Sequence, residues 1–327
     1  MKTLVTGGAG YVGSHAVREL ERQGCQVLVY DNFSRGNRWA VRDGLSIEGD
    51  LADERKLDEL FSAHAIDAVL HFAALAYVGE SVSDPQRYYE NNVANSLTLL
   101  RAMLRHDVKR FILSSTCAVY GIPREIPITE DHPLDPVNPY GMTKLMVERV
   151  LADYGRAHGL KHVSLRYFNA AGADPGGGLG EDHVPETHLI PRVLQTALGL
   201  FDQVEIYGTD YPTKDGTCVR DYVHVTDLAA AHILALRWLL DGGKSETFNL
   251  GTGQGYTVNE VVEKARTLSG RPIPTSASPA RAGDPPVLVA GPEKARKGLG
   301  WTPGHSELEE IISSAWRWHQ GRHSKKG

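Results

Sequence analysis

The sequence predicts an α/β protein in which a doubly wound parallel sheet is followed by a smaller α+β domain. The first observation is an alternation of short β-branched runs with longer helical patterns, which is typical of a parallel sheet covered on both faces. The second is a glycine-rich turn directly after the first of these runs. The third is a change of composition after Ala170, where a loop rich in Gly, Pro and Asp begins.

Six strands are expected in the first half of the chain, at residues 3–7, 25–31, 45–50, 66–73, 110–116 and 162–169. Six strand–helix units predict a complete Rossmann domain over residues 1–169. We expect residues 170–327 to form the smaller, substrate-binding domain, with 221–247 returning to the first domain. Helical patterns in this second half lie at 225–242 and 305–320.

Composition and charge disfavour several classes of function. The chain has 327 residues and a net charge of −5, so neither nucleic acid nor an anionic membrane is an expected partner. Its three cysteines, Cys25, Cys117 and Cys218, give neither a disulfide framework nor a CxxC metal spacing. No apolar run approaches the length of a transmembrane helix or of a signal-peptide core. We therefore expect a cytoplasmic protein.

The glycine-rich turn predicts a dinucleotide site. Gly7, Gly10 and Gly13 form the pattern GxxGxxG between a strand and a helix. These glycines allow a tight turn, a close approach of the backbone to a pyrophosphate, and close packing of the helix on the strand. The helix N-terminus also attracts phosphate. Asp31 ends the second strand, where a carboxylate accepts both ribose hydroxyls and repels a 2′-phosphate, which favours NAD over NADP.

Other residues near this turn have alternative interpretations. Arg35 and Arg38 slightly weaken the preference for NAD, because either guanidinium could hold a 2′-phosphate. Asp50 follows the third strand and could bond an adenine amino group, or could belong to the N-cap region of the next helix. The later GTGQG stretch resembles a phosphate loop, but a structural turn before a helix capped by Thr257 or Asn259 explains it more simply.

Three residues indicate proton-transfer chemistry. Tyr140 and Lys144 are four residues apart and share one helix face. A nearby ammonium and an oxidised nicotinamide both favour the phenolate and lower the pKa of a tyrosine, which can then take a proton from a hydroxyl. Thr116 ends the fifth strand and could orient that hydroxyl. A solvated Tyr/Lys pair and a hydroxyl bonded to local backbone are the alternatives, and the combination with the glycine turn favours catalysis.

Longer stretches then resemble a known family. GGAGYVGSH, FAALAYVGESV, YGMTK, LRYFNAAGA, DYPTKDGTCVRDYVHV and FNLGTGQGYTV are similar to the extended short-chain dehydrogenase/reductases, and within them to the UDP-sugar 4-epimerases. The resemblance covers residues 2 to about 300. It implies reversible epimerisation of UDP-glucose and UDP-galactose at sugar C4 through a bound 4-keto sugar, with NAD recycled in the site. It also implies a homodimer formed through helices near 85–106 and 140–158, packed as a four-helix bundle.

The resemblance also implies roles for individual residues. Tyr140 would take the 4-hydroxyl proton, Lys144 would lower the pKa of Tyr140 and hold the nicotinamide ribose, and Thr116 would bridge to the substrate. The implied NAD-binding residues are Gly7, Gly10, Tyr11, Val12, Gly13, Asp31, Asn32, Asp50, Leu51, Phe72, Ala73, Ala74, Asn91, Tyr140, Lys144 and Tyr167. The implied UDP-sugar residues are Thr116, Tyr140, Asn169, His188, Leu189, Tyr207, Arg220, Tyr222, Arg281 and Asp284. The two arginines suit a diphosphate clamp, or alternatively surface salt bridges.

The chain departs from the family pattern at three positions. Ala76 stands where some members carry Lys, His188 where some carry Asn, and Leu288 where a bulky Tyr often limits the sugar pocket. The preferred UDP-sugar therefore stays open among hexoses, N-acetylhexosamines, pentoses and uronic acids, with glucose and galactose expected.

Three further functions are disfavoured. A 4,6-dehydratase needs an additional carboxylate where this chain has Cys117 and Ala118. A non-catalytic NAD-binding sensor would not need an intact Thr, Tyr and Lys set. Histidine pairs at 183 and 188 and at 319 and 323 could suggest a metal, but we expect polar surface positions and no metal, because the sequence indicates no accompanying acidic or cysteine ligand set.

Overall fold

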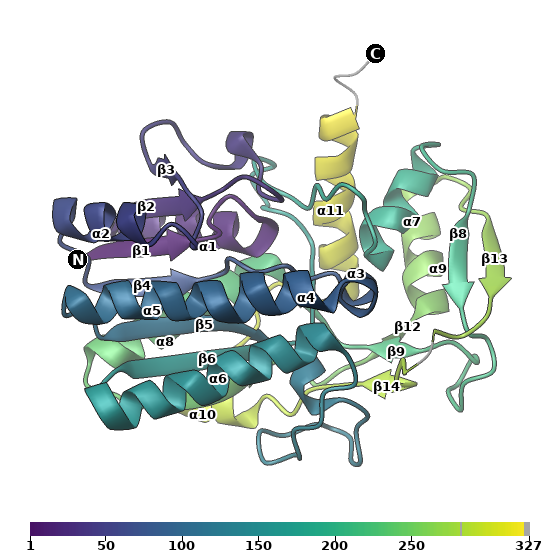
Figure 1. The fold of residues 1–327 in the computed structure, drawn as a ribbon. Helices are drawn as coiled ribbons and strands as arrows, with labels where there is room; N and C mark the ends of the chain where they lie inside the picture. The colour runs from purple at the N-terminus through teal and green to yellow at the C-terminus, as the bar shows by residue number, and fades with distance from the viewer. Residues whose placement is uncertain (282, 324–327) are drawn as a thin grey trace.

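A central parallel sheet organises the chain, which is described here for residues 1–281 and 283–323 by a computed structural model (Figure 1). Within the described residues this sheet has seven strands in the order β11-β6-β5-β4-β1-β2-β3, and every neighbouring pair is parallel. The strands are β1 (Lys2–Thr6), β2 (Gln26–Asp31), β3 (Ser46–Glu48), β4 (Ala68–His71), β5 (Arg110–Thr116), β6 (Lys161–Tyr167) and β11 (Glu246–Leu250). The predicted fold class is confirmed.

Successive residues of each central strand enter different hydrophobic cores. Leu4 belongs to one core and Val5 to the other, and Phe111 and Ile112 divide in the same way. Alternate side chains of a strand point to opposite faces, so a strand buried on both faces needs an unbroken apolar run. The β-branched runs in the sequence have this origin.

Two helical layers cover the sheet (Figure 1). Helices α2 (Glu54–Ala63), α5 (Asn95–Arg105) and α6 (Pro139–His158) supply Leu57, Leu99 and Val147 to the first core. On the other face, α1 (Tyr11–Arg22), α8 (Val225–Leu240) and α10 (Glu293–Leu299) supply Val17, Leu228 and Ala295 to the second. Each helix thus buries an apolar stripe against the sheet.

The chain returns to the large sheet after residue 221. Helix α8 packs against α1, and β11 then pairs with β6 and becomes the edge strand. The strand β11 lies outside the six strands predicted from the sequence. The domain boundaries themselves, 1–169 with 221–247 and 170–327, stay a prediction.

A smaller α+β region lies beside the sheet, on the right in Figure 1. Its core is built from helices α7 (Leu189–Ala197), α9 (Val258–Ser269) and α11 (Leu308–His323). Its short strands are β7 (Asn169–Ala171), β8 (Val204–Tyr207), β9 (Val219–Arg220), β10 (Tyr222–His224), β12 (Tyr256–Thr257), β13 (Thr275–Ser278) and β14 (Val287–Leu288). They pair as β10-β7, β12-β9-β14 and β13-β8.

The GTGQG stretch is a structural turn, as predicted. Thr257 caps α9 through a capping box with Glu260, so Asn259 is not the cap. In the turn itself, the backbone N–H groups of Thr252 and Gly253 donate to the Asp221 carboxylate. A carboxylate of the protein therefore takes the place that a phosphate would occupy.

The predicted helix near 85–106 is broken. Helix α3 (Val78–Ser83) precedes it, and it consists of α4 (Pro85–Tyr88), the π-helical turn η2 (Tyr89–Ala94) and α5. Within η2 the Asn92 side chain bonds the backbone N–H and C=O of Leu75 and the hydroxyl of Thr143. These tertiary bonds account for the local widening of the helix, because π turns are stable only with such support.

The short turns η1 (Arg38–Ala40) and η3 (Cys117–Tyr120) are 3₁₀ helices that follow β2 and β5. Every described helix is too short or too polar to cross a bilayer.

Candidate active site

A cleft lies where the carboxyl ends of β1, β2 and β4 meet, the switch point at which doubly wound sheets bind ligands. Ten of the predicted NAD residues line it: Gly7, Gly10, Asp31, Asn32, Asp50, Leu51, Phe72, Ala73, Ala74 and Asn91. Six lining residues were not predicted from the sequence: Tyr30, Ser34, Arg35, Gly36, Gly49 and Leu75. Tyr30, Gly49 and Leu75 adjoin predicted positions, whereas Ser34, Arg35 and Gly36 lie on the loop after β2 and enter the lining through the path of that loop.

The glycine turn leaves no room for side chains on its inner side. Gly7 has φ +72°, and a Cβ there would lie 2.4 Å from the Ala73 backbone nitrogen. A Cβ on Gly13 would lie 2.3 Å from the Gly7 carbonyl oxygen. Gly10 is more open, and it immediately precedes α1, whose first backbone N–H groups are free for a phosphate.

Two backbone hydrogen bonds fix the Asp31 side chain at the end of β2. Its two carboxylate oxygens accept the backbone N–H groups of Ala9, at 2.9 Å, and Phe33, at 2.8 Å. Burial raises its pKa, and these two hydrogen bonds oppose that rise. Arg35 pairs with Glu80 at 2.7 Å and Arg38 pairs with Glu48 at 2.6 Å. Since both guanidiniums already have a carboxylate partner, the cleft suits an unphosphorylated ribose.

Asp50 lines the cleft next to Asn32. It accepts a hydrogen bond from Asn32 Nδ2 at 2.7 Å and another from the Ala52 backbone N–H at 2.8 Å. The N-cap of α2 is Asp53, so the alternative role of Asp50 as that cap does not apply. Asp50 and Asn32 therefore form one polar pair beside Asp31.

The remaining predicted NAD residues lie away from the cleft lining. The Tyr11 hydroxyl donates to the Gly172 carbonyl at 2.6 Å, while Val12 packs against the sheet core. Near the ends of β5 and β6, the hydroxyls of Tyr167 and Ser114 are 2.9 Å apart. Lys144 Nζ donates to the Ser114 carbonyl, also at 2.9 Å.

The fold brings the three predicted catalytic residues together. Asn138 caps α6 by accepting the Gly141 N–H at 2.8 Å, and Tyr140 lies in the first turn. A Cβ on Gly141 would lie 2.5 Å from the Ala118 carbonyl, so glycine lets α6 approach the end of β5 closely. Tyr140 is thereby placed beside Thr116, whose hydroxyl accepts the Ala118 N–H at 3.1 Å.

Burial dominates the electrostatics of this set. Burial raises the pKa of Tyr140 above its usual value, and the hydrogen bond with Thr116 only partly opposes this. Burial also lowers the pKa of Lys144 to about 8, against the effect of Glu148. The Lys144 ammonium donates to the Ser114 carbonyl, and the lowering of the Tyr140 pKa by Lys144 together with the oxidised nicotinamide stays a prediction.

Four predicted UDP-sugar residues form two contacts in the smaller region. Arg220 Nη2 donates to Asp284 Oδ1 at 2.5 Å, and the Arg281 guanidinium lies 3.9 Å from the centre of the Tyr207 ring. Of the others, Asn169 begins β7, Tyr222 begins β10, and His188 precedes α7, which begins at Leu189. Leu288 on β14 is the register partner of Arg220 on β9.

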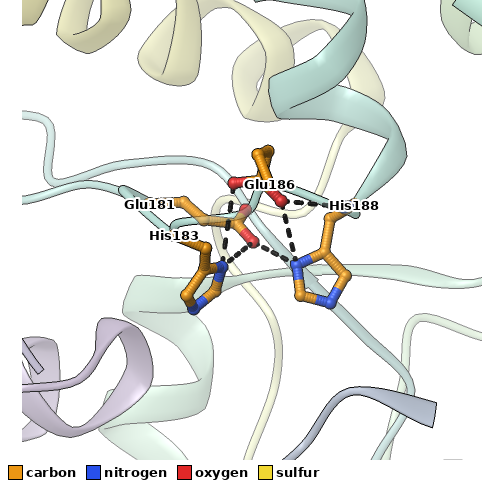
Figure 2. A group of neighbouring side chains, drawn as sticks. All are labelled: Glu181, His183, Glu186 and His188. Carbon is orange, nitrogen blue, oxygen red and sulfur yellow. Dashed lines mark hydrogen bonds and ion pairs between the residues drawn. The ribbon is translucent and has the colours of Figure 1, made fainter. Parts of the chain in front are cut away.

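The environment of two histidine pairs contradicts the prediction. His183 and His188 are accompanied by Glu181 and Glu186, so the expectation of no acidic ligand set is wrong (Figure 2). Burial lowers the pKa of His183, but the two neighbouring glutamates outweigh that effect and raise this pKa to about 10. His319 is only 1% exposed, so it is not a surface residue. Helix packing within the smaller region buries it.

A glycine turn at the switch point, a Tyr–Lys pair on α6 and a hydroxyl at the end of β5 define a dinucleotide-dependent enzyme of the dehydrogenase type. The model of the NAD dependent epimerase/dehydratase family matches residues 3–251, and the chain belongs to this family.

Curated relatives and solved structures agree with this assignment. The chain is 53% identical to a UDP-glucose 4-epimerase of Halalkalibacterium halodurans, over 98% of this chain and 96% of the relative. It is 52% identical to that of Rhizobium leguminosarum bv. trifolii, over 97% and 96%. The structure of UDP-glucose 4-epimerase from Brucella ovis in complex with NAD superposes with a TM-score of 0.94, at 50% identity, covering 96% of this chain and 97% of that one.

Proposed function

We propose that the protein interconverts UDP-glucose and UDP-galactose by epimerisation at sugar C4, with NAD retained in its cleft. The observation that carries this proposal is the placement of Tyr140 and Lys144 on one helix beside Thr116, at the carboxyl edge of the sheet. The UDP-glucose 4-epimerases that share about half of this sequence support the choice of reaction and substrate.

NAD, when bound, supplies a reversible acceptor for the C4 hydride. The glycine turn would accommodate its pyrophosphate, and Asp31 would accept the adenosine ribose hydroxyls. The remaining predicted NAD residues would surround these contacts. Lys144, held by the Ser114 carbonyl, would donate to the second ribose.

Tyr140 would act as the proton carrier for the 4-hydroxyl group. Burial keeps the pKa of Tyr140 high in this structure, even with Lys144 one turn away. A further positive charge is therefore needed to stabilise the phenolate. The oxidised cofactor provides that charge, so deprotonation is coupled to its presence. Thr116 would hold the substrate hydroxyl within reach, and the 4-keto sugar would receive its proton back from the same phenol.

Arg220 and Arg281 would clamp the diphosphate of the UDP-sugar. Both guanidiniums are positioned by neighbours, Asp284 and Tyr207 respectively, which limits their rotamer freedom before binding. Asn169, His188, Leu189 and Tyr222 are proposed to complete the binding of the nucleotide and the sugar.

The test is incubation of the purified protein with UDP-galactose and no added cofactor. UDP-glucose should accumulate with no net NADH. Tyr140→Phe should retain the fold and NAD content while kcat falls about 10²–10⁴-fold, the usual contribution of a general acid–base group. Tyr154→Phe, on the same helix, is the matched control and should keep normal turnover. Full activity of Tyr140→Phe contradicts the assigned role.

We also propose a homodimer formed through α4–α5 and α6. Met146 on α6 is 39% exposed, and its neighbours Val150 and Tyr154 are partly exposed, as are Leu97 and Leu104 on α5. Burial of these apolar side chains in a four-helix bundle would stabilise a dimer. Met146→Glu should yield monomers by size-exclusion chromatography with light scattering, and an unchanged mass contradicts this interface.

A cytoplasmic location is proposed as well. Its support is the free state of Cys25, Cys117 and Cys218, which suits a reducing compartment. Cell fractionation tests it.

A further inference from the structure

Four potential ligand residues gather in the loop between β7 and α7. Figure 2 shows Glu181, His183, Glu186 and His188 directed at one point, although they come from only eight consecutive residues. One ligating atom from each of the four lies within 4.8 Å of all the others. The proposed catalytic steps use none of the first three residues.

The charge of this cluster needs compensation. The side chains of Glu181 and Glu186 are only 4% and 3% exposed. Among the described residues neither carboxylate forms an ion pair with Lys or Arg, and both face the two imidazoles instead. Buried carboxylates are costly unless a positive charge or a metal neutralises them. Two imidazolium ions or one divalent cation would provide the required charge.

The hydrogen-bond pattern favours the cation. Both histidines direct Nδ1 at the carboxylates: His183 Nδ1 is 3.1 Å from Glu181 and 3.7 Å from Glu186, and His188 Nδ1 is 2.5 Å and 3.6 Å from the same two residues. A proton on each Nδ1 can satisfy only one of these contacts. Accordingly, His183 Nδ1 and Glu186 Oε2 are buried without a well-formed hydrogen bond. A metal ion bonds all four ligand atoms at once.

The spacing fits a tetrahedral site. Zinc binds imidazole nitrogen and carboxylate oxygen at about 2.0–2.2 Å, which places tetrahedral ligands roughly 3.4 Å from one another. The nitrogen–oxygen separations range from 2.5 to 3.7 Å and involve both oxygens of Glu186, and one ligating atom from each residue lies within 4.8 Å of the other three. Small side-chain shifts therefore suffice to form a four-coordinate centre, and two nitrogen with two oxygen donors suit zinc better than calcium or magnesium.

We propose that Glu181, His183, Glu186 and His188 bind one Zn²⁺ per chain as a closed structural site. Because all four positions are protein ligands, the ion has no open position for chemistry. It fixes the loop that leads into α7 and holds it against α1 and α3, since the rings of Tyr11 and Tyr77 pack edge-on against His183. The site also orients His188 and Leu189 for the UDP-sugar, and this part of the inference rests on the proposed function.

The test measures binding of Zn²⁺ directly. Holoprotein dialysed against a chelator is titrated with Zn²⁺ in a calorimeter, and metal content is measured by mass spectrometry. The wild type should bind one equivalent, and Co²⁺ in its place should give the intense visible absorption of a tetrahedral centre. His183→Gln and Glu186→Gln should abolish saturable binding while circular dichroism and NAD content persist. His158→Gln, an exposed residue on α6, is the control and should bind one equivalent.

Two results would overturn the site. One is the absence of saturable Zn²⁺ binding to the folded wild type, which leaves two imidazolium ions as the compensating charges. The other is unchanged binding in both variants. Metal removal should raise KM for UDP-galactose more than it lowers kcat. Because binding is measured without turnover, a protein that binds Zn²⁺ but does not epimerise refutes the proposed function and leaves the metal site standing.

Discussion

At the scale of the residue, one buried ion pair supports the catalytic helix. Arg166 on β6 makes two hydrogen bonds to Glu148 on α6, at 2.5 and 3.0 Å, one turn beyond Lys144. Ser115 on β5 donates to the same carboxylate, and Arg166 also donates to the Tyr120 hydroxyl. The pair therefore joins two strands to the helix that carries the Tyr–Lys set.

Removing one member of this pair should be costly. Glu148→Ala leaves Arg166 with an uncompensated charge, so the free energy of unfolding should fall by about 3–5 kcal/mol. Asp153→Ala breaks an exposed ion pair with Arg156 on the same helix and should cost less than about 1 kcal/mol. Urea denaturation measures both changes, and equal effects of the two variants contradict the structural role of the buried pair.

Local spacing in the sequence was enough to propose some of the candidate site residues. Tyr140 and Lys144 follow from their separation on a helix, and Asp31 from its place at a strand end. The high pKa of Tyr140 was not predictable, because burial is set by segments distant in the sequence. The acidic partners of His183 and His188 could have been found from the run EDHVPETH, which alternates carboxylates and imidazoles.

At the scale of the element, the packing of α1 on the glycine turn decides whether a pyrophosphate can be accommodated. Gly13→Ala would place a methyl group 2.3 Å from the Gly7 carbonyl, which the backbone can relieve only by moving the helix. We expect loss of bound NAD from the purified protein and a lower melting temperature. Gly79→Ala, in α3 with open space around it, is the control and should retain NAD. Normal NAD content in Gly13→Ala contradicts this account.

Elements were predictable to different degrees. The six predicted strands correspond to β1 to β6: β1, β4, β5 and β6 are largely buried apolar runs, whereas β3 is short and mostly exposed. The strand β11 was not predicted, because its place in the sheet depends on pairing with β6, which is far away in the sequence. The π turn η2 was not predictable either, because its stability depends on bonds from Asn92 to Leu75 and Thr143 rather than on local periodicity.

At the scale of the whole molecule, buried histidines control acid stability. Burial lowers the pKa of His71 to about 3 and that of His15, His224, His232 and His319 to about 4. Their unfolded pKa is about 6.5. Between these values the unfolded chain binds more protons than the folded one, so stability is full above pH 6.5 and falls as the pH drops towards 4.

The expected slope is large. Each of the five groups contributes up to about 1.4 kcal/mol per pH unit in this window. Urea midpoints measured between pH 7.5 and 5 should therefore decrease steadily, and His232→Gln should reduce the slope by about one proton. In the metal-free protein, His183 opposes this slope, because its pKa is raised to about 10 and the folded chain keeps a proton that the unfolded chain loses near pH 6.5. Constant midpoints across this range contradict the prediction.

The edge position of β11 has a consequence for biosynthesis. Strand β6 leaves the ribosome long before its partner β11, because the paired residues Val163 and Glu246 are far apart in the sequence. Until then the nascent polypeptide carries an unpaired strand edge, which is prone to association with other chains. A polypeptide that ends at residue 169 would keep this edge unpaired permanently. It should therefore accumulate in inclusion bodies rather than as a soluble protein that binds NAD.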